Sequence, residues 1–226
     1  SDLKMFDLIT KTNSNPPAGI NTKVWEWGGK ISADWILFNR NNLNFSNRKW
    51  QKVILYDRNT QHFTTLDSVR GSSNFVGATS VSGDKVAWTK CVKTCDVYVY
   101  DALTKTKDKV PGPAGLQYDG TLVPDGTLYF VHDNGGCGKS AKIMRWTGGA
   151  PEAVGSLPKG VNAYYTFALT QLDGSDSVLY TRWKCSSGAT DIYSLDNADT
   201  LPPLAPVVTR GGGSEYLRPL GWAFGG

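Results

Sequence analysis

Short apolar strands that follow turns recur along the whole chain. Each repeat opens with a turn and an apolar strand, continues through a loop into a second strand, and closes with a third, edge-like segment. The opening turns and strands are residues 33–38, 83–88, 125–130 and 175–180, and the second strands are residues 52–57, 96–101, 142–146 and 191–196. The turn aspartates Asp34, Asp84, Asp125 and Asp176 lie 50, 41 and 51 positions apart. This period predicts four-stranded antiparallel units of about 40–50 residues, the size of a propeller blade.

The two ends of the chain match parts of one further unit. Residues 2–7, followed by Thr10, match the strand and turn at residues 53–57 and Thr60, whereas residues 216–224 match the opening strands of a unit. Pairing the first strands with the last would close a ring and remove exposed sheet edges. We therefore expect an all-β protein, a β-propeller of five four-stranded blades whose last blade is closed by both termini. The expected blades are residues 24–68, 69–112, 113–158, 159–205, and 206–226 joined with 1–23. Four blades with loose ends, or a fragment of a longer propeller, are the alternatives.

One unit carries a specific repeat motif. Residues 124–132 run proline, aspartate, glycine and then an apolar strand, and residues 141–152 supply a second strand and a glycine pair. The segment 124–152 resembles the TolB-like repeat of WD-type β-propellers, closely here and loosely in the other units. For example, the turn at residues 82–84 has its glycine before its aspartate. The resemblance implies a propeller that serves as a protein-binding platform, an extracellular sensor or an enzyme appendage.

Composition narrows the class of protein. The chain has 226 residues, of which 40% are hydrophobic, 19% charged and 12% aromatic, with 25 glycines and 11 prolines. This combination of turn formers and sheet formers favours many short strands over a helical bundle. No apolar run reaches the roughly 18–20 residues of a membrane span. The net charge of +4 is small and scattered, so we expect neither a membrane span nor a nucleic-acid partner.

The four cysteines indicate disulfides. An even number in such a chain favours an oxidising compartment, and a zinc site assisted by His62 or His132 is the alternative. Cys91 and Cys95 flank a three-residue loop between two strand-like runs and are expected to face each other. Cys137 and Cys185 occupy the equivalent loops of the next two units and are expected to bridge neighbouring blades. We expect a secreted or cell-surface protein, extracellular or periplasmic, whose export signal was removed before Ser1, with no metal and no cofactor.

A basic residue recurs at the end of the apolar strand in every unit, two positions beyond an aromatic residue. These residues are Arg40, Lys90, His132 and Arg182. On one interpretation they form an arc that binds an anionic ligand. On the other, each pairs locally with an aspartate such as Asp57 or Asp101 and covers the gap between blades. Trp50 and Trp183 flank polar loops and would either stack on sugar rings or seal the end of a blade.

Catalytic signals are weak. The sequence has no Gly-x-Ser-x-Gly elbow, metalloprotease motif, phosphate-binding loop or dinucleotide fingerprint. Asp119 and Glu26 are the carboxylates expected on innermost strands, where a glycosidase would need them. We expect a non-catalytic, monomeric binding module that recognises a protein or glycan partner on one face. The alternatives are a carbohydrate-active enzyme using Asp119 or Glu26, and a sensor or structural appendage of a longer chain.

Overall fold

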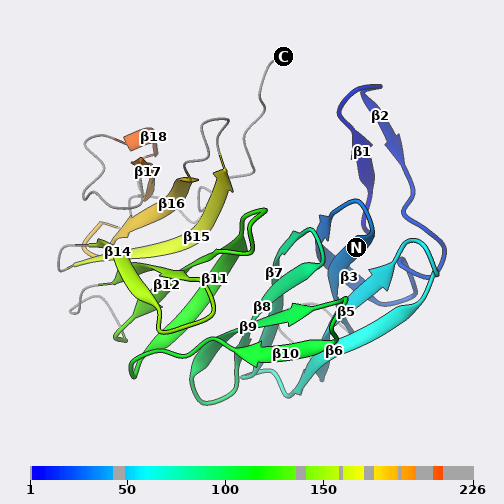
Figure 1. The fold of residues 1–226 in the computed structure, drawn as a ribbon, viewed down its shortest axis with the longest axis horizontal. Helices are drawn as coiled ribbons and strands as arrows, with labels where there is room; N and C mark the ends of the chain where they lie inside the picture. Colours follow the sequence, from blue (N-terminus) through cyan, green and yellow to red (C-terminus); the bar gives the residue numbers. More distant parts are fainter. Residues whose placement is uncertain are drawn as a thin grey trace.

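Antiparallel sheets make up the fold. The computed structural model describes residues 2–42, 49–135, 141–157, 160–170, 176–187, 190–196 and 206–210. These residues contain one two-stranded hairpin, β1 (Met5–Asp7) and β2 (Thr12–Ser14), and four four-stranded sheets (Figure 1). Sheet 1 contains β3 (Trp25–Ile31), β4 (Trp35–Asn41), β5 (Trp50–Asp57) and β6 (Phe63–Arg70). Sheet 2 contains β7 (Phe75–Ser82), β8 (Lys85–Cys91), β9 (Cys95–Asp101) and β10 (Thr106–Lys109).

The other two sheets repeat this order. Sheet 3 contains β11 (Leu116–Leu122), β12 (Leu128–Asp133), β13 (Lys142–Trp146) and β14 (Glu152–Ser156). Sheet 4 contains β15 (Val161–Thr170), β16 (Asp176–Lys184), β17 (Thr190–Asp196) and β18 (Pro206–Arg210). Sheet 4 therefore extends past the expected boundary at residue 205, because β18 pairs with β17 instead of opening a fifth unit. The rest of the expected fifth opening, residues 211–226, lies outside the described residues.

The apolar core lies between the sheets. One cluster joins Leu37 and Val53 of sheet 1 to Val86 and Trp88 of sheet 2, and equivalent clusters join sheet 2 to sheet 3 and sheet 3 to sheet 4. The second strand of each sheet is apolar on both faces because both faces are covered. The aromatic residues that lie two positions before the basic series are accordingly buried: Phe38, Trp88, Phe130 and Tyr180.

The first strands of successive sheets lie against one another. β3 contacts β7, β7 contacts β11, and β11 contacts β15. Each of these four strands has a register shift near its middle, next to Trp27, Ala78, Tyr118 and Tyr164. Such bulges free backbone groups from the ladder and bend the strand.

Side chains from neighbouring sheets bind the backbone at these bulges. Asn39 Oδ1 of β4 accepts the N–H of Ala78 at 2.9 Å, and Thr89 Oγ1 of β8 accepts the N–H of Asp119 at 3.1 Å. Ser80 Oγ of β7 accepts the N–H of Leu122 at 3.0 Å. Between sheets 3 and 4, Thr121 Oγ1 donates to the carbonyl of Thr166 at 2.6 Å. Adjacent sheets are thus held by hydrogen bonds at their inner strands as well as by apolar packing.

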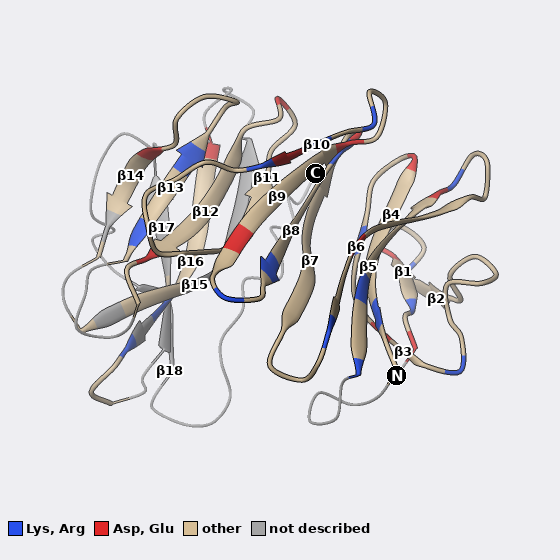
Figure 2. Ribbon diagram, turned by 90° about the horizontal axis from the view of Figure 1, so that it is seen from below, with Lys and Arg blue, Asp and Glu red and all other residues tan. Residues whose placement is uncertain are grey.

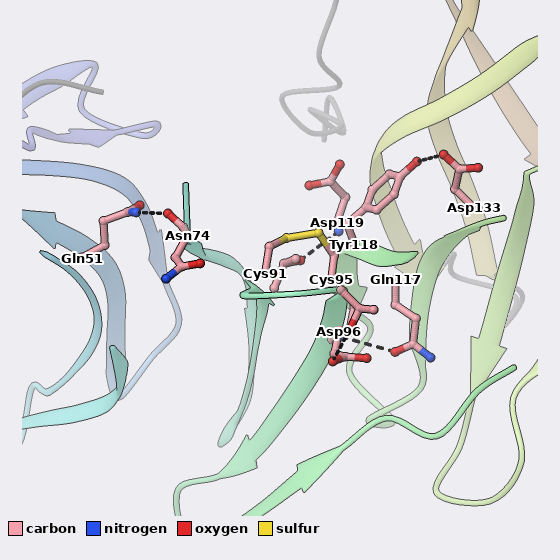
Figure 3. The surroundings of a disulfide bond; sticks show 12 residues. Gln51, Asn74, Cys91, Cys95, Asp96, Gln117, Tyr118, Asp119 and Asp133 are labelled. Carbon is pink, nitrogen blue, oxygen red and sulfur yellow. Dashed lines mark hydrogen bonds between the residues drawn. A yellow bond between two sulfur atoms is a disulfide. The ribbon is translucent and has the colours of Figure 1, made fainter. Parts of the chain in front are cut away.

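A disulfide closes the loop between β8 and β9 (Figure 3). Cys91 and Cys95 are directly paired across the two strands, with their Cα atoms 4.0 Å apart. The predicted bridge is therefore confirmed. Cys185 is also disulfide-bonded, whereas Cys137 lies outside the described residues.

The hydrogen bonds between sheets predict a loss of stability for Ser80→Ala. Leu122 is buried, so its N–H would lose its only hydrogen-bond acceptor seen among the described residues and would stay unsatisfied. We expect the free energy of unfolding to fall by about 1–3 kcal/mol, measured by urea denaturation. The control is Ser73→Ala, at an exposed position between sheets 1 and 2, which should change it by less than about 0.5 kcal/mol. Equal midpoints for the two variants would contradict this role of Ser80.

Candidate binding face

The sheets have two unlike faces. We call the side with the connections between second and third strands, including residues 92–94, the loop face. The links between sheets, such as residues 71–74, lie on it too, because β6 ends and β7 begins there. The opposite side, with the hairpin turns at residues 58–62 and 102–105, is the turn face. In Figure 2, blue segments mark the lower parts of β5, β6 and β8, toward the loop face.

Carboxylates on the turn face have structural roles. Asp84 accepts a hydrogen bond from Trp35 Nε1 of the preceding sheet at 2.8 Å, and Asp176 accepts one from the Tyr129 hydroxyl at 2.6 Å. Burial, together with the Asp176 carboxylate, raises the pKa of Tyr129. These two bonds tie sheet 1 to sheet 2 and sheet 3 to sheet 4. Asp84 and Asp176, two of the repeated turn aspartates, therefore have a structural role.

Asp57 and Asp101 hold their own turns. Their Oδ1 atoms accept backbone N–H groups two and three residues ahead. The backbone hydrogen bond from Thr60 lowers the pKa of Asp57, and that from Thr104 lowers the pKa of Asp101. Neither carboxylate pairs with a residue of the basic series, so the expected local partners have to be corrected.

Arg40 pairs with Glu26 instead. Its Nε lies 2.9 Å from Glu26 Oε1, and its guanidinium also donates to the carbonyl groups of Gly19 and Ile20. Glu26 is buried and accepts a further hydrogen bond from Thr22 Oγ1 at 2.6 Å. The pair therefore fixes the segment that enters β3.

Lys90 pairs with Asp67 at 2.7 Å. Asp67 Oδ2 also accepts hydrogen bonds from Lys107 Nζ at 2.9 Å and from Trp88 Nε1 at 3.1 Å. Lys107 Nζ lies 5.1 Å from the centroid of the Tyr98 ring, and this ring stacks on Trp88. Burial opposes ionisation of the Asp67 carboxyl, but the hydrogen bonds from Lys90 and Lys107 outweigh it and lower its pKa. This cluster joins β6 of sheet 1 to sheet 2.

His132 and Arg182 complete the basic series. His132 is 2% exposed, and neither ring nitrogen has a hydrogen-bond partner in the described part of the chain. Arg182 is half-buried at the equivalent position of β16. Arg40 and Lys90 are thus partly buried and ion-paired, and His132 is buried. Local pairing with a carboxylate therefore describes Arg40 and Lys90, whereas His132 is buried without such a pair.

Trp50 lies at the start of β5 on the loop face and is half-buried. Lys52 Nζ lies 5.5 Å from the centroid of its ring, and Asn42 Oδ1 accepts the backbone N–H groups of Lys49 and Trp50. Trp183 is in β16, but its side chain lies outside the described residues.

A second basic set, which the sequence reasoning missed, lies at the strand ends of the loop face. None of its members has an ion-pair partner among the described residues, and most are exposed. The carboxylates of Glu26, Asp67 and Asp96 near this face are already ion-paired. The set comprises Lys49, Lys52, Arg70, Lys93, Lys142 and Lys184. No spacing rule could have found it, because its members come from strands, loops and links in different sheets.

The two carboxylates considered for catalysis lie on the inner strands of different sheets. Glu26 lies in β3 and is engaged with Arg40, whereas Asp119 lies in β11, two sheets away, at a bulge with a φ of 55°. Figure 3 shows Asp119 near the Cys91–Cys95 disulfide. Within the described part of the chain, no group of three or more metal-binding side chains is found, and no helix has the length and hydrophobicity of a membrane span.

Comparison with known proteins shows the fold. TolB from Acinetobacter baumannii is similar over 90% of this chain and 48% of its own, with a TM-score of 0.61 and 16% identity. A putative TolB from Agrobacterium tumefaciens matches over 79% of this chain and 64% of its own, with a TM-score of 0.55 and 13% identity. The chain has a TolB-like β-propeller fold. It spans about half the length of the Acinetobacter protein, and the number of blades and the closure of the ring stay predictions.

An enzyme is also among the structures of similar fold. Oligogalacturonate lyase in complex with manganese matches over 85% of this chain and 55% of its own, with a TM-score of 0.51 and 16% identity. No family model and no curated protein matches the sequence. The propeller fold is therefore shared by proteins of different function and does not by itself assign one.

The Asp67 cluster predicts a pH-dependent loss of stability. Because the pKa of Asp67 is lowered by folding, its contribution is present above the pKa of the unfolded chain, about 4, and is lost as the pH falls through the folded value. Asp67→Asn should lower the free energy of unfolding by about 1.5–3 kcal/mol at pH 7 and by progressively less below about pH 4. The measurement is urea denaturation across pH, with Asp108→Asn on exposed β10 as the control. A deficit that stays constant down to pH 2 would contradict the ion-pair role.

Proposed function

We propose that this propeller is a non-catalytic binding module that recognises an anionic protein or glycan partner through its loop face. The observation that carries the proposal is the set of Lys49, Lys52, Arg70, Lys93, Lys142 and Lys184, whose charges are not neutralised by ion pairs among the described residues. Glu26, Asp67 and Asp96 near this face are engaged by other bases, which favours attraction of anions to the set. Trp50 adds a flat apolar surface next to Lys52, which suits contact with a sugar ring or an apolar side chain.

The described carboxylates favour binding over hydrolysis. Glu26 is engaged by Arg40 and Thr22, and Asp119 lies in a different sheet. A glycosidase needs two carboxyl groups that flank one bond, and one of these two, Glu26, is already held in a buried ion pair with Arg40. A panel of chromogenic glycosides should therefore show no turnover.

Charge reversal tests the proposed face. The variant Lys93→Glu/Lys184→Glu should weaken binding to polygalacturonate, an acidic glycan, or to poly-glutamate, an acidic polypeptide, by about tenfold or more, because two attractions become repulsions. Binding of the unmodified chain should weaken as salt is raised. The readout is the dissociation constant from biolayer interferometry, with neutral dextran as the negative probe.

The matched control is Lys11→Glu/Lys105→Glu, which makes the same change in net charge at exposed positions of the turns. It should leave the dissociation constant within about twofold, a change of about 0.4 kcal/mol. Equal weakening by both double variants would show that net charge alone is responsible and would overturn the assignment to the loop face. Preference for one polymer identifies the partner as glycan or polypeptide.

We also propose an oxidising location, extracellular or periplasmic, supported by the Cys91–Cys95 disulfide and by the disulfide-bonded state of Cys185. Cys137 is the remaining cysteine of the sequence, and we expect it to pair with Cys185. Non-reducing peptide mapping by mass spectrometry should find both bridges, and loss of the second should cost about 3–4 kcal/mol of stability. Free thiols in the native protein would contradict the pairing and weaken the proposed location.

A further inference from the structure

Three side chains at the loop-face end of sheet 1 share one side of that sheet, and we call them the outer triad. They are Trp50 and Lys52 of β5 and Arg70 of β6. Trp50 lies directly opposite Arg70 and two positions before Lys52, so all three point to the same side. Gln51 points to the other side, where its Nε2 donates to the carbonyl of Asn74 in the link to sheet 2. The outer triad therefore faces away from sheet 2.

The two cations of the outer triad have no ion pair among the described residues. Lys52 lies directly opposite Arg40, and like charges in such a pair repel each other. Glu26, the carboxylate in the same row across the sheet, is held by Arg40 at 2.9 Å. An excess of positive charge therefore remains at Lys52 and Arg70, which is complementary to an added carboxylate.

Trp50 is held in place without being part of the apolar core. None of the apolar clusters of the described residues includes it, whereas Trp35 at the other end of sheet 1 packs on the cluster shared with sheet 2. Asn42 Oδ1 accepts the backbone N–H of Trp50 at 3.1 Å, which fixes the start of β5. Lys52 Nζ lies 5.5 Å from the centroid of the Trp50 ring. A half-buried indole in a fixed position loses little entropy when a ligand binds it.

We propose that the outer triad is a subsite for one uronic acid residue of a glycan, an assignment that rests on the proposed function of the loop face. The C–H groups of the sugar ring lie on the indole of Trp50, and the carboxylate of the same sugar binds Arg70 and Lys52. Arginine suits this role because its paired N–H groups match the two oxygens of a carboxylate.

The chemistry of the outer triad favours an acidic sugar over other ligands. A neutral hexose has the ring face that stacks on an indole, but it has no charge for Lys52 and Arg70. An aspartate or glutamate side chain has the charge, but its flexible aliphatic stem has no flat face for Trp50. A uronic acid residue has both features and therefore uses all three side chains.

Three probes separate these possibilities by isothermal titration calorimetry. Hexagalacturonate has rings and charge, its methyl ester has rings without charge, and poly-glutamate has charge without rings. Trp50→Ala should weaken binding of hexagalacturonate by about tenfold or more, because an aromatic anchor is lost. It should change binding of poly-glutamate by less than about twofold. The unmodified chain should bind the methyl ester at least about tenfold more weakly than the acid.

The cations are tested with a matched pair of variants. Arg70→Gln should weaken binding of hexagalacturonate by about fivefold or more, because the carboxylate loses its planar donor. The control Lys105→Gln removes the same charge from an exposed turn, where Gln61 shows that glutamine fits the equivalent position of sheet 1. This control should leave the dissociation constant within about twofold.

Tryptophan fluorescence locates the contact even if the alanine variant is poorly folded. Hexagalacturonate should change the fluorescence of the unmodified chain and of Trp35→Phe, which alters a half-buried tryptophan at the other end of sheet 1. The same probe should cause no such change in Trp50→Phe, because the responding indole is absent. A full response from Trp50→Phe would overturn the subsite.

The outcomes distinguish this subsite from the proposed function. Binding of neither hexagalacturonate nor poly-glutamate by the unmodified chain would overturn both. Equal affinity for hexagalacturonate and its methyl ester, or the same effect of Trp50→Ala on hexagalacturonate and poly-glutamate, would overturn the uronic acid subsite alone. Stronger binding of poly-glutamate that does not depend on Trp50 would assign the loop face to an acidic polypeptide, which also overturns the subsite and leaves the proposed function intact.

Discussion

The arrangement of the sheets depends on hydrogen bonds between bulged inner strands and the side chains of the adjacent sheet. A bulge leaves backbone N–H and C=O groups without a ladder partner, and in this chain Asn39, Ser80, Thr89 and Thr121 bind them from the neighbouring sheet. Apolar packing brings the sheets together but is tolerant of sliding, whereas an unsatisfied buried N–H costs about 1–3 kcal/mol. The inner strands therefore fix how far each sheet is displaced relative to the next, and the apolar clusters supply most of the attraction.

This constraint limits where a ligand can bind. Many polar groups of the inner strands form hydrogen bonds with neighbouring sheets. The backbone of Asp119 bonds to the sheets on both sides, because its N–H donates to Thr89 Oγ1 of sheet 2 and its carbonyl accepts from Thr166 Oγ1 of sheet 4. Carboxylates on the turn face accept hydrogen bonds from the backbone N–H groups of their own turns, or from a tyrosine hydroxyl or tryptophan indole of the neighbouring sheet. The second basic set on the loop face has no ion pair among the described residues. Function is thus favoured at the positions that the structural hydrogen bonds leave available.

The sequence was sufficient to predict the four-stranded units and the Cys91–Cys95 bridge, because each depends on residues close in sequence or on strand alternation. The partners of Arg40 and Lys90 depend on contacts between strands, and the period contains no information about them. Asp67 lies in a segment that resembles a polar edge strand, yet it is buried beneath Trp88 and two lysines. The bulges were also unpredictable, because Gly28, Thr79 and Asp119 share the position without sharing a residue type.

The edges of the sheets explain why covering β1 matters for the oligomeric state. Outer strand β10 carries four exposed polar or charged residues, Thr106 to Lys109, which discourage pairing with another chain. β1 is less protected, because Phe6 is exposed and no described strand other than β2 pairs with β1. An uncovered apolar edge favours association with a second molecule. The expectation of a monomer therefore depends on whether the edge of β1 is covered.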